Sequence, residues 1–186
     1  MKKSKYFAGM SAIALAFVAV VLGACSSGPK AYEAIEPIIP DDQSAVVYFI
    51  GTKDSGVIWD GETPIGNFDG IFMANIAWKT TPGEHYFMVN TFNWVVTRAD
   101  LEPNKRYFLK IETIPNPIPF AKDLIAVRIL KPEDGEAWLK QVKTLSFTDA
   151  WRTGYAQGKA LQEAREHLQE AESKSMNVDL SGIHGR

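Results

Sequence analysis

Cysteine is nearly absent from this 186-residue chain, which has only Cys25. With one thiol, the chain cannot form an internal disulfide. Basic residues are not in excess either: 20 Lys and Arg stand against 22 Asp and Glu, a formal net charge of −2, which argues against a general nucleic-acid binder. With 46% hydrophobic and 23% charged residues the chain is globular, and its length suits one domain with additions.

Charge is also missing from the start of the chain, where no charged residue lies between Lys5 and Lys30. Three lysines among the first five residues precede the apolar run Phe7–Leu22, which predicts an export signal. The 19-residue run Tyr6–Ala24 is also long enough to span a bilayer. Without its first 24 residues the chain has 162 residues and a net charge of −5. We therefore expect a mildly acidic domain behind a hydrophobic leader.

The end of the leader, Leu22-Gly23-Ala24-Cys25, resembles a bacterial lipobox. The resemblance implies cleavage between Ala24 and Cys25 and attachment of lipid, palmitate included, to the Cys25 thiol. Several acyl chains hold a protein stably on a membrane, whereas one holds it only marginally. Ser26 follows, instead of the Asp that marks inner-membrane retention, so the resemblance implies an outer-membrane lipoprotein facing the periplasm. An uncleaved anchor and an ordinary secretory signal are the alternatives.

Residues 25–43 are predicted to be a tether, because they begin with Ser26-Ser27-Gly28-Pro29 and contain two further prolines, Pro37 and Pro40. Largely extended, such a tether would hold the domain up to roughly 50 Å from the bilayer. Ile35, Ile38 and Ile39 are too apolar for a pure spacer, which indicates that part of this stretch lies along the domain.

Residues 44–131 show short β-branched and aromatic runs separated by turn signals. Asp60-Gly61 is typical of a hairpin turn, and the glycine of Pro82-Gly83 suits a type II turn. The pattern predicts a mainly β domain, an antiparallel β-sandwich of about seven to eight strands. The expected strands are residues 45–50, 57–59, 64–66, 72–78, 85–91, 94–98, 106–113 and 124–130.

The same stretch, Ser44 to Leu130, resembles the small sandwich domains of bacterial lipoproteins described as PEGA-like or as domains of unknown function. The resemblance rests on Val-Ile-Trp-Asp-Gly-x-x-x-Ile-Gly from Val57, Thr-Pro-Gly-Glu-His from Thr81 and Asn-Lys-Arg-Tyr-Phe-Leu from Asn104. These motifs are turn chemistry, so the resemblance implies a fold and carries over no catalytic residue.

Residues 132–174 are predicted to be a C-terminal helical segment. Glu133–Leu145 suits a short helix, and Ser146 or Thr148 offers an N-cap before a second helix of roughly 25 residues, with apolar or small residues every three or four positions. Gly154 and Gly158 within it predict close packing on the sheet or on a second copy. Residues 175–186 are predicted to be a flexible tail.

The chain shows no set of residues typical of an enzyme, and we predict no catalytic residue, metal ligand or cofactor. Asp54-Ser55-Gly56 matches a short aspartic-protease signature, but the preceding Lys53 favours a solvated turn. Glu163, His167 and Glu170 share a helix face and could hold a metal ion, although ordinary ion pairs have the same spacing. His85 and His184 have no evident partner in the sequence.

Two segments are candidates for binding. Phe92 and Trp94 are candidate ligand-binding residues, since an exposed aromatic ring can stack on a sugar, with Asp100 or Glu102 as nearby carboxylates. Trp59, Trp78 and Trp138 are better explained as core residues. The second segment, Pro115 to Phe120, is expected to be stiff and to expose apolar side chains. We favour the interpretation that it caps an end of the sandwich over the alternative that it contacts a partner or a membrane. Its candidate partner-binding residues are Pro115, Pro117, Ile118, Pro119 and Phe120.

These observations favour a non-enzymatic lipoprotein, attached to the outer membrane by its N-terminal lipid, that acts as a binding or scaffolding module for an envelope protein. A glycan-binding or hydrolytic accessory protein acting on peptidoglycan is one alternative. A component of an envelope-spanning complex is the other.

Overall fold

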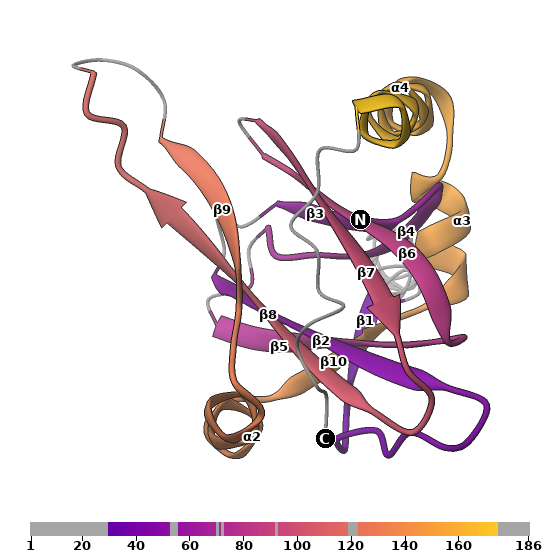
Figure 1. Ribbon diagram of the computed structural model, residues 1–186, viewed down its shortest axis with the longest axis vertical. Helices are drawn as coiled ribbons and strands as arrows, with labels where there is room; N and C mark the ends of the chain where they lie inside the picture. The colour runs from indigo at the N-terminus through magenta and orange to yellow at the C-terminus, as the bar shows by residue number, and fades with distance from the viewer. Residues whose placement is uncertain are drawn as a thin grey trace, which may run out of the picture. The chain divides into compact units, whose positions relative to one another are not determined.

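A computed structural model describes residues 30–52, 56–69, 71, 73–91, 93–118 and 123–174. Within them the chain forms ten strands and three helices, all in a compact unit that begins at Ala31 (Figure 1). The protein is therefore mainly β with a helical C-terminal part, as the sequence predicts.

The strands form two sheets, which we call the large sheet and the small sheet. The large sheet has the order β1 (Tyr32–Ile35), β10 (Thr144–Phe147), β5 (Met73–Thr80), β2 (Ala45–Thr52), β8 (Arg106–Ile114) and β9 (Leu124–Ile129). The small sheet has the order β4 (Thr63–Asn67), β3 (Val57–Asp60), β6 (Gly83–Asn90) and β7 (Trp94–Leu101).

The turns between strands lie where the sequence places them. Gly61 follows Asp60 in the turn between β3 and β4 with a φ of 54°, and Gly83 starts β6 with a φ of 116°. Both values lie in the left-handed region that glycine adopts without steric cost. Asn104, with a φ of 57°, turns the chain between β7 and β8.

Three clusters of buried side chains lie in successive layers. The largest combines side chains of both sheets, such as Phe49 and Leu109 of the large sheet with Ile58 and Phe87 of the small one. A second lies on the other face of the large sheet, under α2 (Pro132–Gln141). A third lies between the small sheet and the two C-terminal helices, α3 (Asp149–Tyr155) and α4 (Gly158–Lys174). Figure 1 shows α2 on one side of the sheets and α3 and α4 on the other.

The strand count exceeds the seven to eight that the sequence predicts, because β1 and β10 also belong to the large sheet. They pair with each other from Tyr32 opposite Phe147 to Ile35 opposite Thr144. Part of the predicted tether therefore lies along the domain, as its apolar residues indicate: residues 32–35 pair with β10, and Ile35 and Ile38 pack against the cluster under α2. Among the described strands six pairs are antiparallel, while β10 with β5 and β2 with β8 are parallel.

The C-terminal helices are shorter than predicted. α2 ends at Gln141, and Leu145 lies in β10, where it fills the core. Thr148 is the N-cap of α3, its hydroxyl accepting a hydrogen bond from the Trp151 amide at 3.3 Å. The expected 25-residue helix is broken between α3 and α4, where Gly158 has a φ of 56°.

The prediction that Gly154 and Gly158 pack closely on the sheet is wrong. A Cβ placed on either glycine would meet no atom of another part of the described chain within 4 Å. Packing on a second copy stays a prediction.

Candidate functional site

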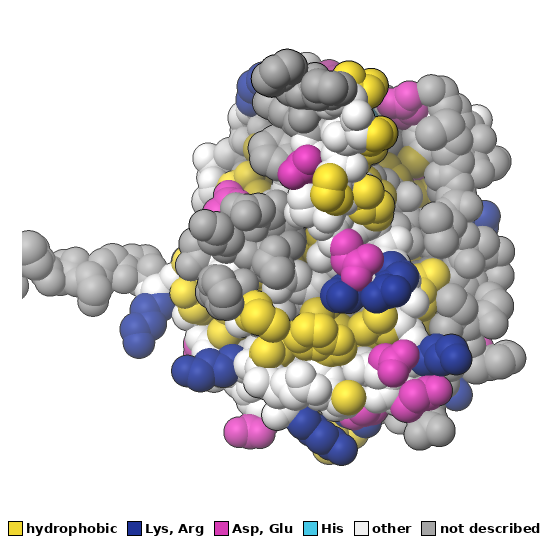
Figure 2. All heavy atoms as spheres, turned by 90° about the vertical axis from the view of Figure 1, so that its left-hand side faces the viewer, with side chains coloured by type: hydrophobic (Ala, Val, Ile, Leu, Met, Phe, Trp, Pro, Cys, Tyr) yellow, Lys and Arg dark blue, Asp and Glu magenta, His cyan; other side chains and the backbone are white. Residues whose placement is uncertain are grey.

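The first candidate site is the arm, the part of β8 and β9 that extends beyond the rest of the large sheet (Figure 1). Ile114 and Leu124 face each other across its two strands, and about half of each side chain is exposed. Ile118, beyond β8, is 65% exposed. Large apolar side chains gathered at one exposed end are typical of a contact surface. Figure 2 shows this side of the molecule, with hydrophobic side chains at its surface.

The loop at the end of the arm is held by its own polar groups. The Asn116 amide donates to Asp123 Oδ1 at 3.2 Å, and the Ile118 amide donates to Asn116 Oδ1 at 3.0 Å. Pro115, Pro117 and Ile118 are exposed. The favoured interpretation, that this segment caps an end of the sandwich, is therefore wrong for residues 115–118. Pro119 and Phe120 lie outside the described residues.

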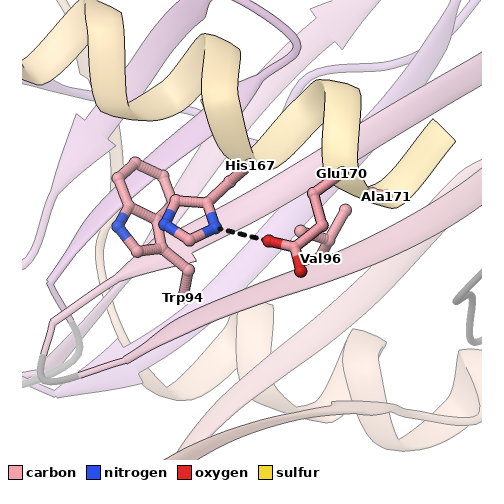
Figure 3. Close-up of a pocket in the computed structure, with 5 residues that line it drawn as sticks. All are labelled: Trp94, Val96, His167, Glu170 and Ala171. Atoms are coloured by element: carbon pink, nitrogen blue, oxygen red, sulfur yellow. Dashed lines mark ion pairs between the residues drawn. The ribbon is translucent and has the colours of Figure 1, made fainter. Parts of the chain in front are cut away.

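The second candidate site is a pocket of about 270 Å³ between β7 and α4 (Figure 3). The ring of Trp94, the first residue of β7, stacks on the ring of His167 from α4, with centroids 4.8 Å apart and planes 28° apart. His167 Nδ1 lies 3.6 Å from Glu170 Oε2. Val96 and Ala171 complete the lining.

This pocket joins Trp94 to residues other than those expected. Asp100 lies at the far end of β7, roughly 20 Å along the strand, because each residue advances a strand by about 3.3 Å. Glu170 supplies the carboxylate instead, while His167 covers one face of the Trp94 ring. Phe92, the other candidate ligand-binding residue, lies outside the described residues.

Two carboxylates on α4 lie next to nitrogen atoms of side chains on the same helix. Glu163 Oε1 lies 3.0 Å from Lys159 Nζ, and Glu170 pairs with His167. In the part of the chain that the structure describes, no group of three His, Cys, Asp or Glu side chains could hold a metal ion. Of the protease signature, Asp54 and Ser55 lie outside that part, as do Ala24 and Cys25 of the lipobox.

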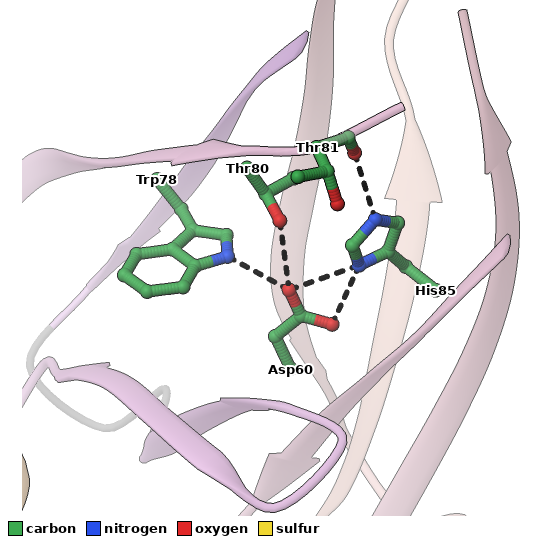
Figure 4. Close-up of polar contacts among 5 residues, drawn as sticks. All are labelled: Asp60, Trp78, Thr80, Thr81 and His85. Atoms are coloured by element: carbon green, nitrogen blue, oxygen red, sulfur yellow. Dashed lines mark hydrogen bonds and ion pairs between the residues drawn. The ribbon is translucent and has the colours of Figure 1, made fainter. Parts of the chain in front are cut away.

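A buried polar cluster around Asp60 is the feature that sequence reasoning missed (Figure 4). Asp60 accepts hydrogen bonds from Trp78 Nε1 at 2.8 Å and from Thr80 Oγ1 at 3.4 Å, and its two oxygens lie 2.9 and 3.0 Å from His85 Nδ1. His85 Nε2 lies 2.9 Å from the Thr81 carbonyl oxygen. The cluster ties β3 and β6 of the small sheet to β5 of the large sheet.

The contacts of this cluster indicate a structural role. Both ring nitrogens of His85 face acceptors, so the doubly protonated ring satisfies both, and neither nitrogen is left to act as a base. Asp60 and His85 side chains are only 11% and 13% exposed. Burial opposes the charged ring, but the hydrogen bond and charge of Asp60 and the bond to Thr81 outweigh burial and raise the pKa of His85 above 6.5. This contact depends on the register of β3 and β6. Asp60 lies opposite Phe87, and His85 is two residues from Phe87 on the same face of β6.

Stability is expected to fall as pH rises above about 6.5. A raised pKa in the folded state means that the charged His85 ring stabilises the fold fully below the unfolded value of 6.5, and that this stabilisation is lost as pH passes the folded value. Urea unfolding at pH values from 5 to 9 measures the slope. His85→Gln and Asp60→Asn should both flatten it; an unchanged slope in both variants contradicts the assignment.

None of the helices in the described part of the chain is long and apolar enough to cross a membrane. Comparisons with protein families, with curated proteins and with solved structures found no match to this chain.

Proposed function

We propose that this protein is a non-enzymatic lipoprotein of the bacterial outer membrane that binds an envelope protein through the arm. The observation that carries the proposal is the exposed apolar end of β8 and β9, formed by Ile114, Ile118 and Leu124. An exposed apolar cluster on a folded domain is typical of a surface that a partner covers. The lipobox supplies the attachment to the membrane.

The start of β1 supports a short tether. Because Ala31 already packs on the core and its carbonyl oxygen accepts a hydrogen bond from the Thr148 amide, at most the six residues from Cys25 to Lys30 could serve as a tether. Six residues span at most about 20 Å, at roughly 3.3–3.6 Å each, well below the 50 Å expected from the sequence. The domain would then stay close to the bilayer that holds the lipid.

The two sheets support a β-sandwich as the domain that the lipid carries. One core cluster contains side chains of both sheets, and Phe49 of the large sheet contacts Phe87 of the small sheet edge to face at 5.3 Å. Stacked sheets share a core in this way.

His85 supports a non-enzymatic role, because both of its ring nitrogens are engaged, one by Asp60 and the other by the Thr81 carbonyl oxygen. A general base needs a free nitrogen within reach of the proton that it removes.

Lipid attachment is tested by Cys25→Ser in the full chain. Cells fed radioactive palmitate should label the wild-type protein, and the variant should lose at least nine tenths of the label and leave the membrane fraction. The reason is that only Cys25 offers a thiol. Undiminished labelling together with unchanged membrane association of the variant contradicts the lipid anchor.

Partner binding is tested by cross-linking in cells. A photo-reactive residue at Ile118 is expected to give a discrete product with an envelope protein. The matched control is Ile39, a more exposed side chain at 80% that lies before β2 and not on the arm. Equal amounts of cross-linked product from both positions, or no product from Ile118, would mean that the arm is not the surface that binds the partner.

Glycan binding at the pocket under α4 is the second candidate, favoured by the meeting of Trp94 with a carboxylate. Retention of the full chain on purified peptidoglycan measures it. Trp94→Ala is then expected to reduce retention about tenfold, if a sugar ring stacked on the indole contributes at the low end of the roughly 1–3 kcal/mol that a stacked nucleic-acid base contributes on one aromatic ring. Trp138→Ala, far from the pocket lining, is the control, and failure of the wild-type protein to bind ends this candidate.

A further inference from the structure

The face of the arm on the α2 side carries alternating residues of β8 and β9. Side chains two positions apart share a face of a strand, and paired residues of neighbouring strands do too. Starting from the end of the arm, three pairs follow one another on this face: Ile114 with Leu124, Glu112 with Ala126, and Lys110 with Arg128. The face therefore begins apolar and becomes charged toward the body of the domain.

The charged part of the face has an excess of positive charge. Lys110 Nζ lies 2.8 Å and Arg128 Nη2 3.1 Å from the same oxygen, Oε1 of Glu112. The hydrogen bond from Lys110 lowers the pKa of Glu112, so this carboxyl stays ionised. Two cations then share one anion, and the Arg128 side chain is 60% exposed. Its guanidinium has donors enough for a second carboxylate.

A small apolar hollow lies beyond the charges. It is about 40 Å³ in volume, and its walls include Met73, Trp138 and Val142 as well as the aliphatic chain of Lys110. Lys110 Nζ lies 5.6 Å from the centre of the Trp138 ring, so the lysine belongs to both the charged part and the hollow. Met73 is 42% exposed at the rim. A space of this size and lining suits the end of one apolar side chain.

The three parts make one continuous surface. Figure 2 shows hydrophobic side chains on either side of a cluster of basic and acidic side chains on this side of the molecule. A bilayer would cover an unbroken apolar or basic surface, but here Glu112 lies between the two apolar parts. An alternating segment of protein matches the pattern better, because an acidic side chain can meet the cations while apolar side chains meet the patches.

We propose that this surface binds an extended segment of a partner protein that carries a carboxylate between apolar side chains. The carboxylate pairs with Arg128 and Lys110, one apolar side chain covers Ile114 and Leu124, and another enters the hollow beside Met73 and Trp138. Ile114 lies four residues from Lys110, about 13 Å along the strand, so the carboxylate follows the first apolar side chain by about four positions. This inference rests on the proposed docking function and names its partner's chemistry.

Selection from a library of random 12-residue peptides tests the inference. The bait is the full chain purified in detergent, and the expected result is enrichment of peptides with Asp or Glu flanked by Leu, Ile or Phe. The Kd of an enriched peptide is then measured by fluorescence anisotropy. Arg128→Glu should weaken binding at least tenfold, because it turns an attraction into a repulsion, and Met73→Ser should weaken it severalfold. Lys159→Glu, a reversal of an 89% exposed lysine on α4, should leave the Kd unchanged.

Three results of the selection and binding measurements overturn the inference. They are selected peptides without an acidic residue, a Kd that Arg128→Glu leaves unchanged, and binding of vesicles containing anionic lipid that outcompetes the peptide. Self-association that buries the arm, measured by sedimentation, would assign the surface to a second copy and also overturn it. The selection is done in detergent and therefore does not depend on attachment to a membrane. An absence of palmitate labelling would contradict the lipid anchor and leave this surface untouched. An absence of peptide binding would contradict this surface and leave the lipid anchor untouched.

Discussion

Gly135→Ala is expected to destabilise the protein by about 2 kcal/mol or more, although alanine is the better helix former. Gly135 is buried in α2, and a Cβ there would overlap the ring of Phe108 from β8. That ring cannot move aside, since it is 1% exposed and stacks on Tyr48 at 5.4 Å. The overlap therefore outweighs the roughly 1 kcal/mol that alanine adds to a helix. Urea unfolding followed by tryptophan fluorescence measures the change.

Gly154→Ala is the matched control for this prediction. Gly154 is also in a helix, α3, but nothing lies within 4 Å of the added methyl group. Alanine should be neutral there or stabilise by up to about 1 kcal/mol. Adding Phe108→Leu to Gly135→Ala should recover part of the loss, because a smaller side chain makes room. If both glycine variants unfold alike, α2 does not pack on Phe108.

Turn residues explain why most strands could be predicted from the sequence. The hairpin at Asp60-Gly61, the glycine at position 83 and Asn104 need a backbone conformation that only a few residue types adopt readily, and this requirement is local. The runs between them alternate or are β-branched. Eight of the strands can therefore be predicted from neighbouring residues alone.

The pairing of β1 with β10 could not be predicted, because its cause is not local. Tyr32–Ile35 and Thr144–Phe147 are four-residue segments far apart in the chain, and each becomes a strand by hydrogen bonding to the other. Thr144–Phe147 follows a helix without a proline or glycine stop, so helical periodicity continued through it. Leu145 and Phe147 lie in the core because β10 pairs in parallel with β5.

Whether each candidate site could be predicted from the sequence also depends on whether its cause is local. The loop at the end of the arm could be singled out from the sequence, since alternating prolines prevent residues 115–119 from pairing in a sheet, but its exposure could not, because the sequence pattern favours a cap on the sandwich. The contact of Asp60 with His85 depends on the register of β3 and β6, and that of Trp94 with His167 on where α4 crosses β7. For this reason the sequence does not predict the carboxylate that meets Trp94: Asp100 lies on the same face of β7 but roughly 20 Å along the strand, whereas α4 places Glu170 beside the ring.

Phe87→Ala is expected to destabilise the protein by about 3–5 kcal/mol, the usual loss when a buried phenylalanine is removed from a core that cannot collapse. Phe87 is 1% exposed and meets Phe49 from the other sheet edge to face at 5.3 Å. Ile114→Ala, on the half-exposed arm, should change the free energy of unfolding by less than about 0.5 kcal/mol.

The cycle of Phe49→Ala, Phe87→Ala and the double variant isolates the contact between the sheets. His85 also stacks on Phe87 at 5.7 Å, so the single variant alone mixes two losses. In the cycle the contribution of His85 cancels, and a coupling of about 0.5–1.5 kcal/mol is expected for an aromatic pair of this geometry. Additive losses would mean that the two rings do not touch, and the sheets would then not share the core on which the sandwich proposal rests.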